Sequence, residues 1–293
     1  MSLFSIIIPS HDRAALLVRL LESIGRQTCR DFEVILVDDA SLDREAYDRI
    51  VQQFGGALPL RYIRNARNRG AQYSRNCGVE AATGTWLAFV DDDDEWLPRK
   101  LERQAQALAD APAQVGLIYA WADAVGADGA PLHTYRSGLR GALMKELCEG
   151  CFIPSPTVVV RRAALEKAGK FDEILTSCQD WDMWLRVAEA GYDIEVVPEV
   201  LALHHKHGGP SIGTSPRSLL GYYRFYQKHE TLYRQMGLRR YLSEKYRGLA
   251  HQASRAGDRF LAGKALGRSL ALWKGNWKAW VRRLEWALGH SKK

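Results

Sequence analysis

Cysteines are few and scattered in this sequence. The 293 residues include five of them, at Cys29, Cys77, Cys148, Cys151 and Cys178. Cys148 and Cys151 form the one close pair, and no second pair completes the four ligands of a structural zinc site. An odd, dispersed set favours small buried side chains in a reducing compartment over a disulfide framework. We therefore expect a cytoplasmic protein.

Long apolar runs are also missing. No run approaches the roughly 18–20 residues that cross a bilayer as a helix. The N-terminal segment MSLFSIIIPSHDR has neither a basic leader nor a small-residue cleavage site, so we expect a first strand there and not a signal peptide. An apolar fraction of 46% with 26% charged residues is typical of a globular protein.

Acidic residues are scarce near the C-terminus. From Arg217 to the end the chain has 18 Lys and Arg against 4 Asp and Glu, whereas the preceding part has 23 against 30. Two regions of opposite charge predict two separate functions. We expect a domain of residues 1–215 followed by a basic, helical region of residues 216–293.

Strand-like and helix-like segments alternate in the first third of the chain. Four short apolar runs are typical of buried strands: residues 5–9, 33–37, 60–64 and 86–90. Their alternation with amphipathic segments predicts an α/β fold with a mostly parallel sheet flanked by helices. Ligands bind beyond the carboxyl ends of the strands in such sheets. Two of the runs end at Asp38 and Asp91, so we expect these carboxylates to share one site.

Four consecutive aspartates, Asp91 to Asp94, follow the last of these runs. Carboxylates packed so closely raise each other's pKa unless a cation neutralises them. Their oxygens suit Mg²⁺ or Mn²⁺, which also coordinate phosphate. A solvated acidic loop is the alternative, but the position directly after a buried strand favours a metal site.

Several short motifs follow one another in a fixed order. They are IIIPSHDR at 6–13, VDDAS at 37–41, NRG at 68–70 with SRN at 74–76, FVDDDDEWLP at 89–98, and GKFDE at 169–173 leading to QDWDMW at 179–184. In this order and spacing they resemble the family 2 glycosyltransferases of GT-A fold, over about residues 3–210.

The resemblance implies an inverting, metal-dependent enzyme that moves a sugar from a nucleotide-sugar donor to an acceptor hydroxyl. It places the donor nucleotide at Pro9, His11, Arg13, Asp38, Asp39, Arg69, Asp91 and Asp92. Asp93 would be the ligand of Mn²⁺ or Mg²⁺, and Asp180 would be the catalytic base. Gln179 stands where the family often has Glu, and it contributes no charge beside the base.

The chemistry of these residues agrees with the roles that the resemblance implies. Inverting transfer is one in-line displacement, which needs a general base for the acceptor hydroxyl and a Lewis acid for the departing diphosphate. Asp182 is the alternative base, and either carboxylate can instead serve only to stabilise the start of a helix. His207 precedes two glycines and is an additional candidate metal ligand, whereas His204 and His205 belong to a strand-like run.

Two other enzyme classes would need motifs that this sequence lacks. A sugar nucleotidyltransferase would carry a Gly-rich, basic loop where Pro9 to Arg13 stand, and a dinucleotide-dependent oxidoreductase would need G-x-G-x-x-G there. A catalytically silent nucleotide-binding scaffold of the same fold stays open, although the intact Asp91, Asp93 and Asp180 set argues against it.

The partners that we expect follow from the class and from the basic tail. They are a nucleotide-sugar donor and a glycan or lipid-linked acceptor, in the assembly of a bacterial surface glycan such as lipopolysaccharide or capsule. Tryptophans alternate with Lys and Arg in residues 273–286. Helices of this type can lie on the inner face of the cytoplasmic membrane, hold an acidic acceptor, or pack as a bundle against the catalytic domain. No nucleic acid is expected, since no binding module accompanies the charge.

Overall fold

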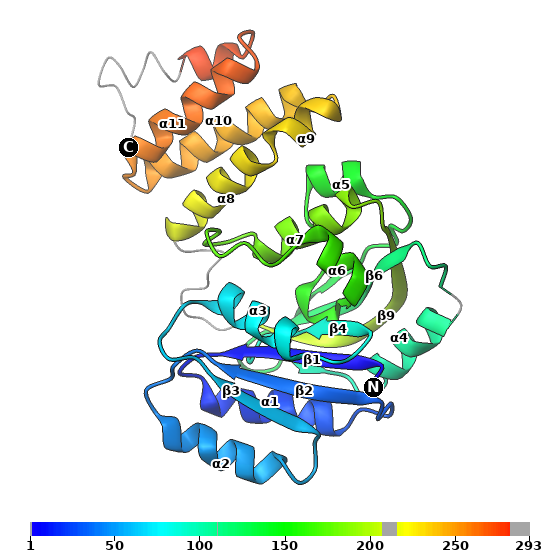
Figure 1. The fold of residues 1–293 in the computed structure, drawn as a ribbon. Helices are drawn as coiled ribbons and strands as arrows, with labels where there is room; N and C mark the ends of the chain where they lie inside the picture. The colour runs from blue at the N-terminus through cyan, green and yellow to red at the C-terminus, as the bar shows by residue number, and fades with distance from the viewer. Residues whose placement is uncertain (1, 110, 207–215, 282–293) are drawn as a thin grey trace. The chain divides into compact units, whose positions relative to one another are not determined.

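The computed structural model describes residues 2–109, 111–206 and 216–281 (Figure 1). The chain forms two compact units, one of Met1–Glu173 with Asp180–Gly208 and one of Ile174–Gln179 with Gly209–Lys293. His207, the additional candidate metal ligand, lies outside the described residues.

Among the described residues, nine strands of the first unit form one sheet in the order β3-β2-β1-β4-β8-β6-β9-β5, with β7 paired to β6. The strands are β1 (Phe4–Ser10), β2 (Phe32–Asp38), β3 (Leu60–Arg64), β4 (Trp86–Phe89), β5 (Glu95–Trp96), β6 (Val115–Val125), β7 (Pro131–Tyr135), β8 (Val159–Arg161) and β9 (Asp193–His205).

Helices flank this sheet, as Figure 1 shows. They are α1 (Ala14–Gly25), α2 (Arg44–Phe54), α3 (Ala71–Ala81), α4 (Lys100–Ala109), α5 (Met144–Glu149), α6 (Arg162–Ala168) and α7 (Gln179–Glu189), with a 3-10 turn η1 (Ser155–Thr157) before β8. Helices α1 and α2 lie on one face of β1, β2 and β3, and α3 lies on the other (Figure 1). The predicted α/β fold is confirmed.

The sheet is parallel in one part and mixed in the other. Strands β3, β2, β1 and β4 are all parallel, as the apolar runs predicted. Strand β8 then enters antiparallel to both β4 and β6, while β6 and β9 pair in parallel. The expectation of a mostly parallel sheet thus holds for the first four strands, because an apolar run predicts burial but not strand direction.

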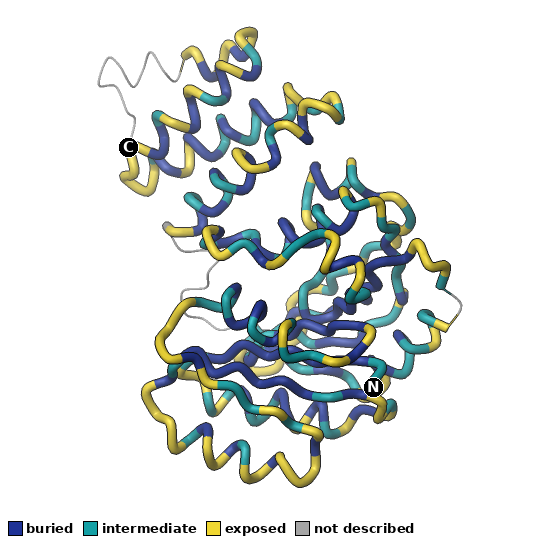
Figure 2. The backbone as a smooth tube through the Cα atoms, in the orientation of Figure 1, coloured by how far each residue is buried: buried dark blue, intermediate teal, exposed yellow. Residues whose placement is uncertain are grey.

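Strand β1 is buried on both faces, which explains its continuous apolar run (Figure 2). Ile6 and Ile8 join the core on the side of α1 and α2. Ile7 points to the other side, where a Cβ on Gly78 of α3 would lie 2.4 Å from its Cγ2 atom. Full burial of each isoleucine contributes about 1.5–3 kcal/mol. This packing holds the carboxyl end of β1 rigidly beside the acidic loop after β4.

The second unit contains the helices α8 (Pro216–Lys228), α9 (Glu230–Gln235), α10 (Arg239–Arg255) and α11 (Arg259–Leu272). The segment Ile174–Gln179 belongs to it, and Ser177 Oγ donates a hydrogen bond of 3.0 Å to the carbonyl of Ser218. Tyrosines from three helices pack in its interior: Tyr223, Tyr226, Tyr233 and Tyr246. The expected helical C-terminal region is present. No helix in the described residues combines the length and the apolar character that crossing a bilayer requires.

Candidate active site

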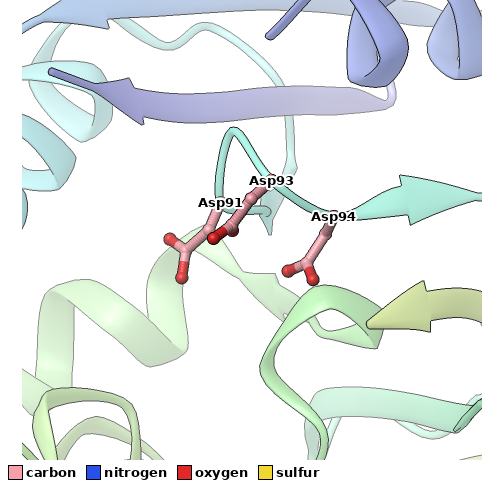
Figure 3. A group of neighbouring side chains, drawn as sticks. All are labelled: Asp91, Asp93 and Asp94. Carbon is pink, nitrogen blue, oxygen red and sulfur yellow. The ribbon is translucent and has the colours of Figure 1, made fainter. Parts of the chain in front are cut away.

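The four aspartates form the turn between β4 and β5. Asp91, Asp93 and Asp94 project to the same side of this turn (Figure 3), and one ligand oxygen from each lies within 4.8 Å of the others. Asp92 is turned the other way, and its Oδ2 atom accepts a hydrogen bond of 2.7 Å from Ser10 at the end of β1. Three hard carboxylate ligands at this spacing fit a divalent cation such as Mg²⁺ or Mn²⁺.

Burial and mutual repulsion raise the pKa of two of these carboxyls. Burial raises the pKa of Asp94 to about 7, and it raises that of Asp92 to about 6 against the hydrogen bond from Ser10 and the charge of Arg13. Arg13 Nη1 lies 3.2 Å from Asp92 and 2.9 Å from Asp93, so it neutralises part of the cluster. The cluster therefore attracts cations, as expected of closely packed carboxylates.

Arg75 in α3 is the counter-charge on the other side of the cluster. Its side chain is 5% exposed, and Nη2 lies 2.5 Å from Asp91 Oδ1 while Nη1 lies 3.9 Å from Asp180 Oδ1. Burial opposes the charged form, but the charges of Asp91 and Asp180 keep the pKa of Arg75 above its ordinary value. Nε and Nη1 are buried without a hydrogen-bond partner among the described residues. Arg75 belongs to the SRN motif at 74–76, but the sequence predicted no role for it.

A cavity of about 280 Å³ opens beside the acidic turn. Its lining residues are Asp91, Asp94, Tyr135, Cys151, Phe152, Ile153, Pro154, Ser155, Pro156, Asp180 and His204. Asp180 lies in the first turn of α7, where Ser155 Oγ donates to its Oδ2 atom at 2.6 Å. The alternative base, Asp182, is buried and forms an ion pair with Arg186 at 2.8 Å. Of the two candidates, Asp180 is the one that lines this cavity.

Two residues that line the cavity have properties that the sequence did not predict. Cys151 is exposed, so the expectation of buried cysteines is wrong for this residue. His204, near the end of β9, places Nδ1 2.7 Å from Asp94 Oδ1, and this hydrogen bond raises the pKa of the imidazole. The pair joins residues 110 positions apart, which no local pattern signals.

Asp38 and Asp39 follow β2 and are both buried. Asp38 accepts hydrogen bonds from the Ser41 amide and the Tyr62 hydroxyl, each at 2.8 Å. Burial alone would raise the pKa of Asp38, but these bonds and the charge of Arg64 hold it below its ordinary value. Asp39 accepts from the amides of Arg69 at 3.0 Å and Gly70 at 2.6 Å, so it shapes the loop that precedes α3.

The remaining predicted donor residues lie at the same edge of the sheet. Pro9 is buried in β1 in register with Val37 of β2. His11 Nε2 lies 3.4 Å from Asp12. The guanidinium of Arg69 stacks 3.6 Å above the centre of the Tyr73 ring and lies 3.2 Å from Glu173. Ion pairs thus join Arg13 to the acidic turn, whereas the Arg69 side chain contacts Tyr73 and Glu173.

The family model for glycosyl transferase family 2 matches residues 5–169. An Escherichia coli K12 protein, named provisionally as the colanic acid biosynthesis glycosyl transferase WcaA, is 32% identical over 240 residues, which cover 78% of this chain and 81% of that protein. An uncharacterized glycosyltransferase of Haemophilus influenzae is also 32% identical, over 64% of this chain. The matched part spans 62% of that relative's length, less than two thirds of it.

Solved structures resemble the fold along most of the chain. S. aureus TarS 1-349 in complex with UDP-GlcNAc has a TM-score of 0.63 at 20% identity, covering 94% of this chain and 74% of that one. The mannosyltransferase PcManGT of Pyrobaculum calidifontis, in complex with GDP-Man and Mn²⁺, has a TM-score of 0.62 at 19% identity, covering 99% and 81%. At these identities the likeness concerns the fold, and it confirms the GT-A architecture.

These matches favour neither the silent scaffold nor the sugar nucleotidyltransferase. The family model covers more than half of the chain, and the E. coli relative is aligned over more than two thirds of its length. The resemblance seen in the motifs is therefore confirmed, and the chain belongs to glycosyl transferase family 2.

Proposed function

We propose that this protein is a metal-dependent, inverting glycosyltransferase that moves a sugar from a nucleotide-sugar donor to an acceptor hydroxyl. One observation carries the proposal: Asp180 lines the same cavity as Asp91, which belongs to the acidic cluster. A carboxylate for the acceptor and a charged site for the donor diphosphate are thereby adjacent. Transfer of a proton to such a carboxylate typically supplies a factor of about 10²–10⁴ in rate.

The reaction that we propose is a single displacement. The acceptor hydroxyl gives its proton to Asp180 while its oxygen bonds to the anomeric carbon, and the bond from that carbon to the phosphate oxygen breaks with its electron pair. The nucleoside diphosphate leaves on the opposite face, so the anomeric configuration inverts. Ser155 orients Asp180 through the hydrogen bond of 2.6 Å. No covalent intermediate is needed, so no nucleophilic Ser or Cys is required.

Asp93 is the metal ligand in this proposal, with Asp91 and Asp94 beside it and His207 as an additional candidate. Bound Mn²⁺ or Mg²⁺ would supply charge stabilisation for the leaving diphosphate. The Mn²⁺ of the mannosyltransferase complex supports a divalent ion of this kind.

The donor nucleotide would lie at the carboxyl ends of β1 and β2. We assign contacts with it to Pro9, His11, Arg13, Asp38, Asp39, Arg69, Asp91 and Asp92. Because Asp38 and Asp39 already accept protein hydrogen bonds, much of their contribution is to hold the surrounding loops in shape. We assign this chemistry to residues 1–215, and we propose residues 216–293 as a separate, basic region.

The acceptor side is proposed from the relatives and from the surface. The name of the E. coli relative supports a role in bacterial surface glycan assembly, on a glycan or lipid-linked acceptor. Trp277, Trp280 and Val281 are exposed next to Lys274 and Lys278. Exposed aromatic side chains interleaved with lysines suit an anionic bilayer surface. We propose peripheral contact with the inner face of the cytoplasmic membrane.

Two substitutions separate the donor half of the reaction from the acceptor half. Asp93→Asn should weaken the Mn²⁺-dependent thermal stabilisation by UDP or GDP, whichever binds. Asp180→Asn should keep that stabilisation and lower the release of nucleoside diphosphate from the corresponding nucleotide sugar by about 10²-fold or more. Asp48→Asn, on the exposed face of α2, is the matched control. Near-normal turnover of Asp180→Asn would refute the base assignment.

A further inference from the structure

The cavity beside Asp180 has two chemically different sets of lining groups. One continuous stretch, residues 152–156, supplies apolar surface from Phe152, Ile153 and two prolines, and Tyr135 adds an aromatic ring. The carboxyl groups and the imidazole come from other elements, namely the acidic turn, α7 and β9. A ligand in this cavity therefore meets apolar surface from one segment of chain and carboxylates with an imidazole from others.

His204 is held in one orientation at this cavity. Its Nδ1 atom is engaged with Asp94 at 2.7 Å, and its ring meets Tyr135 edge to face at 6.3 Å between centroids. Asp94 itself is fixed by burial. Among the described residues Nε2 has no hydrogen-bond partner, and the side chain is 33% exposed. The second ring nitrogen is therefore available to a ligand in the cavity.

We propose that this cavity binds the acceptor as a single neutral pyranose residue, and that His204 is a specificity-determining contact for one of its hydroxyls. The inference rests on the proposed role of Asp180, because the reacting hydroxyl must come within about 2.6–3.2 Å of the base. Of the residues assigned to the donor nucleotide, only Asp91 lines the cavity. The space next to Asp180 is thus left for the acceptor.

The charged groups and the volume of the cavity both favour a single neutral pyranose. Asp91, Asp94 and Asp180 line the cavity, and each of them that is ionised would repel an acidic sugar by about 1–4 kcal/mol at 4 Å. A neutral pyranose instead donates its hydroxyls to carboxylate oxygens and packs its C–H face on Phe152 and Tyr135. The volume of about 280 Å³ is at the lower end of small-molecule sites, which span about 300–1,000 Å³, so one ring fits and a longer segment extends outside.

Cys151 provides a readout at the cavity itself, because this residue is exposed and lines the cavity. We would measure iodoacetamide labelling of Cys151 by peptide mass spectrometry, with methyl glucoside, methyl galactoside, methyl mannoside or methyl glucuronide at equal concentrations. At least one neutral glycoside should slow labelling while the glucuronide does not, and labelling of Cys29 should stay unchanged. Protection by the glucuronide alone, or by no glycoside at tens of millimolar, would overturn the proposal. So would protection by a nucleotide sugar only, since it would assign the cavity to the donor sugar.

Variants at His204 test the specific contact. His204→Ala should raise the protecting glycoside concentration about 3–10-fold, the loss of one hydrogen bond of about 1 kcal/mol. His204→Gln should recover part of the protection, and His205→Gln on the same strand should behave as the parent protein. Unchanged protection in His204→Ala would overturn the assignment, and so would loss of Mn²⁺-dependent nucleotide stabilisation. Labelling requires no turnover, so this outcome is separate from failure of the proposed glycosyl transfer.

Discussion

Lys100, the first residue of α4, is a fully buried lysine that forms no ion pair with a carboxylate among the described residues. Its Nζ atom lies 3.8 Å from the centre of the Trp96 ring and 2.7 Å from Gln104 Oε1. Burial lowers the pKa of this amine well below its ordinary value. A positive charge is also unfavourable at the N-terminal end of a helix. We predict that the amine loses its proton at a lower pH in the folded protein than in the unfolded chain.

Because the pKa of Lys100 is lower in the folded protein than in the unfolded chain, the free energy of unfolding depends on pH. An unfolded lysine titrates near about 10.4, so below that pH the unfolded chain binds more protons than the folded one. The free energy of unfolding should therefore rise with pH between the folded and unfolded pKa values, by up to about 1.4 kcal/mol per pH unit. Between pH 7 and pH 9 the gain from this one group is up to about 3 kcal/mol. A buried cation–π contact with Trp96 contributes about 2 kcal/mol or somewhat more, which is less than the several kcal/mol that desolvation of a buried ammonium costs.

Lys100→Met tests this reasoning. Methionine fills a similar volume without an amine, so the variant should lack the rise in stability between pH 7 and pH 9. Urea unfolding followed by tryptophan fluorescence at both pH values gives the difference between the two proteins. Lys145→Met, at an exposed position of α5, should keep the rise. If Lys100→Met and the parent protein gained equally between pH 7 and pH 9, Lys100 would be charged in the folded state.

Two further predictions concern Arg75 and the second unit. Arg75→Met should destabilise the protein by about 1–3 kcal/mol, because it leaves Asp91 and Asp180 without their counter-charge while water still reaches these carboxylates, which are 43% and 25% exposed. Mn²⁺ should raise the melting temperature of Arg75→Met more than that of the exposed control Arg44→Met, because it replaces the missing charge beside Asp91; an equal rise in both would contradict this. Trp277→Ser with Trp280→Ser should reduce co-sedimentation with vesicles of phosphatidylglycerol and phosphatidylcholine. Equal binding of the parent protein to vesicles of phosphatidylcholine alone would count against an anionic membrane surface.

The sequence predicted the parts of the fold that depend on local pattern. Strands β1, β2 and β4 are covered on both faces, so they appear as continuous apolar runs. The acidic turn was predictable because Asp91 to Asp94 directly follow such a run. The antiparallel entry of β8 was not, since its three residues pair with β4 and β6 through contacts that leave no periodic signal.

The sequence predicted single residues of the candidate site, but it did not predict which of them contact one another. Arg75 and Asp91 are 16 positions apart, Ser155 and Asp180 are 25 apart, and Asp94 and His204 are 110 apart. Each pair depends on how the sheet brings distant segments together. A motif identifies Asp180 as a carboxylate of interest, but the fold alone decides that a hydroxyl orients it and that a guanidinium lies beside it.

The four aspartates have the same side chain, but each lies in a different environment. Asp92 turns toward Ser10 and Arg13, where its carboxylate fastens the acidic turn to β1. Asp94 turns into the protein and orients His204. Asp91 pairs with Arg75, which also approaches Asp180, so it links the acidic turn to the proposed base. Asp93 contacts the half-exposed Arg13, a side chain that can move aside when a metal ion binds. An alanine at Asp92 should therefore affect folding most, and one at Asp93 should affect metal binding most, although the sequence presents the two as equivalent.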